Sequence, residues 1–184
     1  MNEQSDRFDT NSVHPFFHLL NQIGLAAENR ELYFVALMSA LAIPDICGAL
    51  ESADGLATGA KYKSWYDKWM AHKYQIQGTT SLTGQDCYML RCAALHQGRL
   101  SHPRAQISRI IFIEPGIGKY TLHNNLMNGC LNIDLYNFCY DMLNSASDWF
   151  EQVVGTDPFE KNHSVSMQRH PYGFGPIHGV PVIA

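Results

Sequence analysis

The chain has 184 residues, of which 46% are hydrophobic and 16% are charged. This length and composition predict one globular domain with a hydrophobic core and exclude a disordered chain. The formal net charge of −4 gives no sign of a strongly basic nucleic-acid binder.

The first part of the chain predicts two helices. Residues 1–12 are polar and acidic, unlike a signal peptide. A first helix is predicted over residues 14–27. A second helix is predicted over residues 31–51; it is apolar nearly all round and should be the central core element. Its longest apolar run, Tyr33 to Pro44, is shorter than the roughly 20 residues of a membrane span, so no membrane attachment is expected. The cysteines, described below, predict a cytoplasmic protein.

Pro44 and Asp45 interrupt the second predicted helix. Proline removes a backbone donor and clashes with the preceding turn, so Pro44 is expected to kink or restart the helix. Asp45 stands among apolar residues. It is either a charge at a helix start or the partner of a cation in the interior, for which Arg91 is a candidate.

A third helix is predicted over residues 60–73. Its aromatic residues repeat at helical spacing and lie between lysines. The aromatic residues are Tyr62, Trp65, Tyr66 and Trp69. The favoured interpretation is a core stripe flanked by solvated lysines, and the alternatives are a base-stacking surface or the roof of a small-molecule pocket.

A fourth helix is predicted from Thr83 to about Arg99. Thr83 is a good N-cap, Asp86 stands where a capping box needs an acceptor, and Gly98 can end the helix in a left-handed conformation. The helix interior is apolar except for Arg91 and His96. Buried cations are costly unless they are paired or used, so these two residues are the candidate functional residues.

The remaining sequence predicts a small β insert, a last helix and a tail. Strands are predicted over residues 106–114, 120–123 and 131–133, and the last helix over residues 134–154. The Gly116–Lys119 stretch lacks the full pattern of a phosphate loop.

Residues 155–184 hold four prolines, four glycines and three histidines, which predicts an extended tail. Those histidines are seven and eight residues apart, too far for typical zinc ligand spacing.

The predicted fold class is therefore mainly α. We expect one bundle of about five helices over residues 1–154, with the β insert at about 106–133 and the tail at 155–184. The cysteines show no zinc-ligand spacing, and most stand on apolar helical stretches, so they are predicted to be reduced thiols. They are Cys47, Cys87, Cys92, Cys130 and Cys139. No metal or other cofactor is expected.

Charge is unevenly distributed along the chain. Residues 1–60 hold 2 basic and 8 acidic side chains, residues 61–109 hold 8 and 2, and residues 110–184 hold 3 and 7. The positive block surrounds Arg91 and His96. It suggests a face that binds anions, with Arg99 and Lys68 as candidate RNA contacts, although an ordinary solvated helix surface also explains lysines of this kind.

The hexapeptide from Arg91 to His96, Arg-Cys-Ala-Ala-Leu-His, resembles the motif of the HEPN family (higher eukaryotes and prokaryotes nucleotide-binding domains). That motif is an arginine, four to six residues and a histidine near the end of a helix in an all-α bundle. The chain departs from it at Cys92, where the family often has asparagine, and at Gly98, where it often has an aromatic residue. Many members are dimeric, metal-independent RNases of toxin or defence systems, and others are inactive binding or sensing modules.

The resemblance implies roles for individual residues. His96 would be the general acid or base and Arg91 would hold the phosphate, with Asp45 and Asp86 as candidate supporting residues. The partners would be RNA, a second copy and an antitoxin or regulatory protein. Five residues place Arg91 and His96 about 140° apart on an ideal helix, so they share a face only if the helix ends or bends there. The Arg91 side chain is long enough to reach part of the way round, and a site built from two subunits is the other solution and the expected one. The alternative is a non-catalytic binding module in which both residues are structural.

Overall fold

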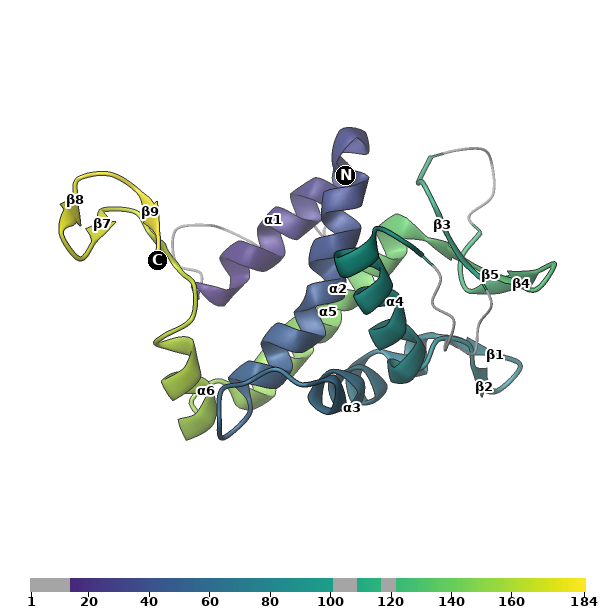
Figure 1. The fold of residues 1–184 in the computed structure, drawn as a ribbon, viewed down its shortest axis with the longest axis horizontal. Helices are drawn as coiled ribbons and strands as arrows, with labels where there is room; N and C mark the ends of the chain where they lie inside the picture. The colour runs from purple at the N-terminus through teal and green to yellow at the C-terminus, as the bar shows by residue number, and fades with distance from the viewer. Residues whose placement is uncertain (1–13, 101–108, 117–121) are drawn as a thin grey trace.

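The computed structural model describes residues 14–100, 109–116 and 122–184, and within them it forms six α-helices and several short strands (Figure 1). The predicted mainly α fold class is confirmed. The helices are α1 (Phe16–Glu28), α2 (Tyr33–Leu50), α3 (Gly59–Trp69), α4 (Gly84–Gln97), α5 (Leu135–Val153) and α6 (Asp157–His163). Two short 3-10 helices are also present. One, η2 (Arg30–Leu32), comes directly before α2, and the other, η3 (Ala71–Lys73), follows α3.

The β insert is a three-stranded sheet in the order β3 (Ile110–Ile113), β5 (Cys130–Asp134), β4 (Asn125–Met127). The β3 and β5 strands are parallel, and β4 runs antiparallel to β5. The second strand of the insert, β4, thus begins after the predicted range 120–123. Parts of the predicted strands 106–114 and 120–123 fall within residues 101–108 and 117–121, which are outside the described part of the chain. A hairpin of β1 (Gln75–Ile76) and β2 (Thr79–Thr80) before α4 was not predicted from the sequence.

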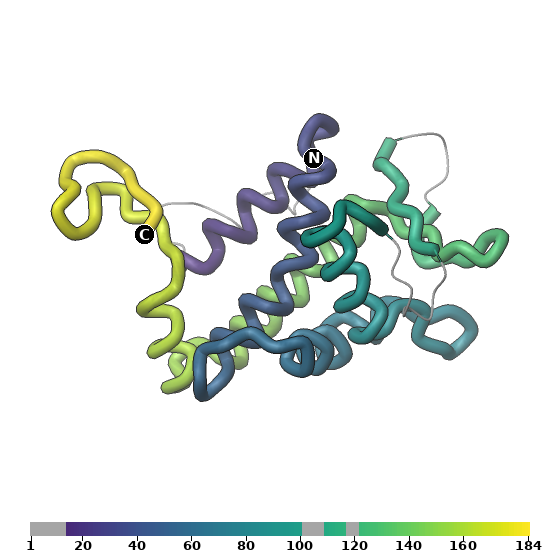
Figure 2. Tube along the Cα trace, in the orientation of Figure 1, coloured from purple at the N-terminus to yellow at the C-terminus, as the bar shows by residue number. Residues whose placement is uncertain are grey.

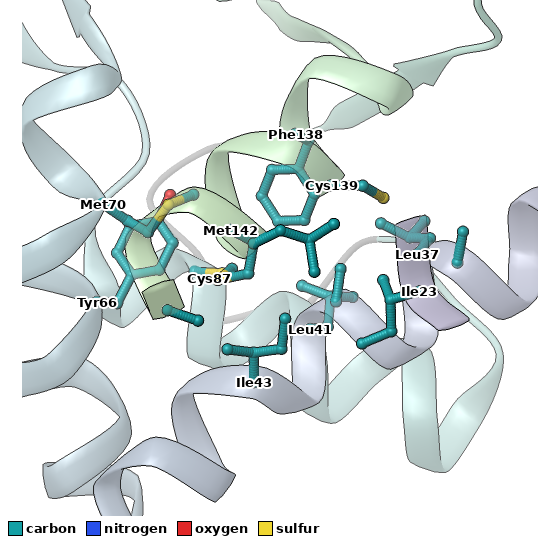
Figure 3. Close-up of a cluster of buried hydrophobic side chains, with 14 of the residues drawn as sticks. Ile23, Leu37, Leu41, Ile43, Tyr66, Met70, Cys87, Phe138, Cys139 and Met142 are labelled. Atoms are coloured by element: carbon teal, nitrogen blue, oxygen red, sulfur yellow. The ribbon is translucent and has the colours of Figure 1, made fainter. Parts of the chain in front are cut away.

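Helix α2 is the centre of the bundle, as its all-round apolar sequence predicts. It contacts α1, α3, α4 and α5 (Figures 1 and 2). Leu41 and Ile43 of α2 lie fully buried with Met142 of α5 and Cys87 of α4 (Figure 3). Helices α2 and α4, which carry Asp45 and the Arg91–His96 motif, therefore share one buried core.

Pro44 lies inside α2 without ending it. A proline at this position removes a helical hydrogen bond and strains the turn before it. Here the buried hydroxyl of Tyr62, from α3, donates a hydrogen bond of 3.0 Å to the Leu41 carbonyl in that turn. A side chain of the neighbouring helix α3 thus donates a hydrogen bond to a backbone carbonyl near the proline, and Asp45 follows Pro44 on the same continuous helix.

The continuous helical stretch Arg30–Leu50 is long and apolar enough to cross a membrane, with a mean hydropathy of 1.7. Half of it is buried within the bundle. This is the packing of a central core helix, and length and composition alone are weak grounds for a membrane span.

The C-terminal region begins with a helix that the sequence analysis missed. Helix α6 starts after Thr156 with Pro158 in its first turn. The Asn162 side chain donates hydrogen bonds to three carbonyls at the end of α2, and this ties α6 to the core. Those carbonyls belong to Ala49, Leu50 and Ser52, at 3.2, 3.1 and 2.7 Å. Beyond α6 the chain forms short paired strands, β6 (Arg169–His170), β7 (Gly173–Phe174), β8 (Ile177–His178) and β9 (Val182–Ile183), where a simple extended tail was predicted.

Two histidine rings meet where α6 packs against the start of α1. The ring centroids of His14 and His163 are 4.5 Å apart, and both rings lie against Phe159. Burial lowers the pKa of both histidines, the opposing influence of Glu160 notwithstanding. The folded protein therefore favours the neutral form of both rings.

Acid should consequently weaken this junction. A histidine whose pKa is lowered by folding stabilises the native state above its unfolded pKa of 6.5, and that stability is lost as the pH falls through the folded pKa. We expect the free energy of unfolding to decrease from pH 7 to pH 5, by at most about 1.4 kcal/mol per pH unit for each histidine. His163→Phe should flatten this dependence in urea unfolding, whereas His178→Phe, at an exposed site, should not. Equal slopes for the two variants would contradict the assignment.

Candidate functional site

Helix α4 begins and ends as its sequence predicts. The Thr83 hydroxyl accepts a hydrogen bond from the Asp86 backbone N–H at 3.1 Å, and the Asp86 carboxylate accepts one from the Thr83 N–H, which completes a capping box. Gly98 ends the helix with φ 62°, in the left-handed region. Both boundaries of the helix that carries the motif are therefore set locally.

The start of α4 is also fixed against α3. The Gly84 N–H donates to the Asp67 carboxylate at 2.6 Å. A Cβ added to Gly84 would lie only 2.5 Å from the Lys63 carbonyl oxygen, so only glycine fits this close approach. The two helices thus meet at one defined distance.

Asp86 lies away from the motif residues. It is buried in the first turn of α4, whereas His96 stands in the last turn, roughly 15 Å along the axis at 1.5 Å per residue. Asp86 therefore serves the helix cap, and the structure does not bring it to Arg91 and His96 as a supporting residue.

Asp45 does join the motif. Its Oδ2 lies 2.7 Å from Nε of Arg91, and both atoms are shut off from solvent. The pair connects α2 with α4, and of the two sequence interpretations of Asp45 the interior ion pair is the one observed. This buried ion pair holds the Nε side of the Arg91 guanidinium against Asp45.

Burial and the ion pair act oppositely on these two groups. Desolvation raises the pKa of Asp45, although Arg91 and His96 both act to lower it. Desolvation also acts to lower the pKa of Arg91, but Asp45 and the neighbouring Cys92 more than offset it, so the pKa of Arg91 is raised. The guanidinium is therefore permanently charged at this site.

His96 completes a chain of three side chains. Nη1 of Arg91 lies 3.1 Å from Nε2 of His96, which is exposed in the last turn of α4. The arginine side chain spans the angle that separates the two residues on the helix, so one chain brings them together without a second subunit. Because arginine only donates, Nε2 of His96 accepts, which places the proton of a neutral imidazole on Nδ1.

Sequence reasoning gave no role at this site to Cys92, which lies within the motif, or to Tyr88 and Lys63, which lie beside it. Contact with Cys92 raises the pKa of Tyr88. Nζ of Lys63 lies 5.8 Å from the centroid of the Tyr88 ring. Tyr88 stands three residues before Arg91 and four before Cys92 on one helix, and this spacing could have identified it. Lys63 lies on α3, and its position depends on how that helix packs against α4.

The other candidate residues have less specific positions. Arg99 follows α4 and is exposed. Lys68, on α3, is also exposed and lies with its Nζ 4.6 Å from the centroid of the Trp69 ring. Both stay candidates for phosphate contacts from solvent.

Three aromatic residues of α3 are fully buried, so the core interpretation of this stripe is confirmed for them and base stacking is not. They are Tyr62, Trp65 and Tyr66. The fourth, Trp69, is partly buried against the core.

Among the described residues, no group of three or more His, Cys, Asp or Glu side chains is placed to hold a metal ion. No protein-family model, no curated protein and no solved structure matches this chain. The candidate chemistry of the site therefore rests on Asp45, Arg91 and His96.

Proposed function

We propose that the protein is a metal-independent endoribonuclease of HEPN type that works in the cytoplasm as a homodimer, in a toxin or defence system. The observation that carries the proposal is the guanidinium of Arg91, whose inner nitrogen is anchored on Asp45 and whose outer nitrogen meets the exposed ring of His96. This combines a fixed anion-binding group with an accessible acid or base. RNA cleavage needs these two functions and no metal.

Arg91 would bind the phosphate at the scissile bond. A guanidinium has five N–H donors. His96 engages one of them, and Nε is held beside Asp45 in an ion pair without the alignment of a hydrogen bond. The remaining donors suit the two non-bridging oxygens of a phosphodiester in a bidentate arrangement. The same positive charge would stabilise the additional negative charge on the phosphorus oxygens in the transition state.

His96 would move the protons. In the structure its Nε2 is occupied by Nη1 of Arg91, and a phosphate oxygen that takes over this donor would release Nε2. The free Nε2 would remove the proton of the ribose 2′-OH while the 2′ oxygen attacks phosphorus and the bond to the 5′ oxygen breaks. The departing 5′ oxygen then takes up a proton, and the products are a 2′,3′-cyclic phosphate and a 5′-OH.

A second copy would supply the second proton-transfer group. The outer side of α4 presents Cys92 and Leu95 between Arg91 and His96, with Met89 before them, and all three side chains are partly or largely exposed. A two-fold axis beside this face would bury it and bring two histidines to one site. One would act as base and the other as acid. An antitoxin or regulator that covers this face would control access.

The direct test is incubation of the purified protein with single-stranded RNA in excess EDTA. We expect cleavage with products that end in 2′,3′-cyclic phosphate. A DNA strand of the same sequence should stay intact, because DNA has no 2′-OH. Absence of cleavage under these conditions would favour the alternative.

The alternative is a non-catalytic binding module of the same fold. The observation in its favour is that Arg91 already has partners on both sides, in Asp45 and His96. In that case RNA would bind without being cut, and Arg91 would serve mainly to join α2 to α4.

RNA binding should weaken with salt if the positive block 61–109 contacts the phosphates. Each phosphate contact to single-stranded nucleic acid contributes about 0.7 to the slope of log affinity against log salt. Lys68→Ala and Arg99→Ala should each lower the slope by about this amount in fluorescence anisotropy. The matched control is Lys161→Ala, because Lys161 is exposed on α6, outside the block. Slopes that fall equally in all three variants would contradict the assignment.

A further inference from the structure

Residues 164–184, the C-terminal arm, form a hairpin of two short strand pairs. Strand β6 (Arg169–His170) pairs with β9 (Val182–Ile183), and β7 (Gly173–Phe174) pairs with β8 (Ile177–His178). Gln168 and Ala184 exchange backbone hydrogen bonds of 2.7 and 3.0 Å at the base of the arm. The arm projects from the α6 end of the bundle (Figures 1 and 2).

The arm exposes large apolar side chains on a structure that cannot bury them alone. Two-stranded hairpins are at best marginally stable in water unless another element covers a face. Yet Tyr172 is 85% exposed and Phe174 is 55% exposed. The other exposed apolar residues of the arm are Val165, Met167, Ile177, Val180 and Ile183. An apolar group of this kind marks an interaction surface.

The chemistry of the arm favours a protein partner over a nucleic acid. Most of its exposed apolar residues are aliphatic, and aliphatic side chains offer no stacking surface for bases. The arm has no acidic side chain, and its only permanently charged side chain is Arg169. A matching surface would be apolar with an acidic border.

The chain itself carries such a surface at the turn between α1 and α2, here called the α1–α2 patch. Phe34, Val35 and Met38 lie at helical spacing on the outer side of α2, and Phe34 is 80% exposed. Leu25 and Leu32 extend the exposed apolar area along the turn. Exposed carboxylates of Glu28 and Glu31 border it, with Arg30 between them. Figure 1 places this turn apart from the arm of the same chain.

We propose that the arm of each copy docks on the α1–α2 patch of a second copy, so that two chains exchange arms about a two-fold axis. Each chain contains both halves of this contact, so a reciprocal exchange covers both apolar surfaces twice and closes without further subunits. Arg169 of the arm then lies near the acidic border of Glu28 and Glu31. The proposal builds on the homodimer proposed above but does not depend on RNA cleavage.

Hydrodynamic size tests the contact without reference to activity. The wild type should be a dimer at micromolar concentration by sedimentation equilibrium. The arm variant Tyr172→Ser/Phe174→Ser and the patch variant Phe34→Ser/Val35→Ser should each weaken dimerisation at least about tenfold. Both pairs are solvent-exposed, so circular dichroism should show unchanged folding. The control is Leu56→Ser, because Leu56, between α2 and α3, has an exposed fraction within the range of the four mutated residues.

Photo-crosslinking identifies what the arm contacts. A photoreactive phenylalanine analogue replaces Tyr172 in a mixture of ¹⁴N- and ¹⁵N-labelled protein. Mixed-isotope crosslinks to the peptide that spans residues 25–38 support the exchange. Crosslinks within one chain, crosslinks from arm to arm, a monomeric wild type, or a dimer insensitive to both double variants would each overturn it. An active RNase whose dimer is insensitive to both double variants would reject this interface alone, and an inert but arm-exchanged dimer would reject cleavage alone.

Discussion

Replacement of His96 by alanine is expected to slow RNA cleavage by roughly 10² to 10⁴-fold, the usual contribution of a general acid or base. The side chain is exposed in the last turn of α4, and its partner in the structure is Nη1 of Arg91. Its loss should therefore change the free energy of unfolding by no more than about 0.5 kcal/mol. Cleavage rates in EDTA and urea unfolding measure the two effects on the same samples.

Two alanine variants serve as controls for this result. Gln97→Ala changes the neighbouring exposed residue of the same turn, and His72→Ala removes an exposed histidine elsewhere. Both should retain wild-type cleavage. If His96→Ala cleaves as fast as these controls, any observed RNase activity belongs to another site or to a contaminant. If the wild type itself is inert in every buffer, the binding-module alternative is the better description.

The local features of α4 were predictable because they depend on near neighbours in the sequence. Thr83, Asp86 and Gly98 occupy positions where capping chemistry fixes residue types, and each has the predicted role in the helix boundary. The central position of α2 followed from its all-round apolar pattern. The core role of the α3 aromatic residues followed from their spacing.

The arrangement of the site could be predicted only in part, because it depends on contacts far apart in sequence. Asp45 was a candidate partner of Arg91, but a helix-start role fitted its sequence context equally well; the packing of α2 on α4 decides between them. The angle between Arg91 and His96 suggested two separate faces, which the long arginine side chain was expected to bridge only in part. The length of the arginine side chain closes that gap to 3.1 Å.

The C-terminal region was the least predictable. Its proline and glycine content indicated an extended chain, so the short helix α6 was not predicted. That helix depends on tertiary contacts: Asn162 bonds to the end of α2, and the Phe159 ring is buried against the Trp149 ring of α5. A seven-residue helix is too short to be stable on propensity alone, so the local start signals, Thr156 followed by Asp157 and Pro158, were not enough to predict it.

The second large effect is expected at Asp45. Removal of one partner from a buried ion pair typically costs about 3 to 5 kcal/mol because it leaves a buried charge unpaired. Here the side chains of Arg91 and Asp45 keep 22% and 14% exposure, so water can compensate in part. We therefore expect Asp45→Ala to lower the free energy of unfolding by about 1 to 3 kcal/mol. Urea unfolding at pH 7 measures this loss.

Arg91→Ala should lose comparable stability, and the double variant should lose less than the sum of the two. The double variant has neither charge, so no unpaired ion is left inside the protein. A coupling energy near zero would show that the 2.7 Å contact has no energetic weight. The corresponding effect on function is separate: Arg91→Ala should also reduce cleavage about as strongly as the His96 change, because it removes the phosphate-binding group.

Asp45→Asn separates positioning of Arg91 from direct chemistry. An asparagine side-chain oxygen can still accept from Nε of Arg91, so this variant should keep the guanidinium orientation and most of the cleavage rate, whereas Asp45→Ala should lose both. The loss in Asp45→Ala should fall mainly on kcat, since a displaced guanidinium still attracts the RNA but no longer fits the transition state. If alanine and asparagine lower kcat equally while only alanine lowers stability, the charge of Asp45 itself takes part in the reaction. If neither variant changes cleavage, the ion pair only joins α2 to α4 and has no role in the reaction.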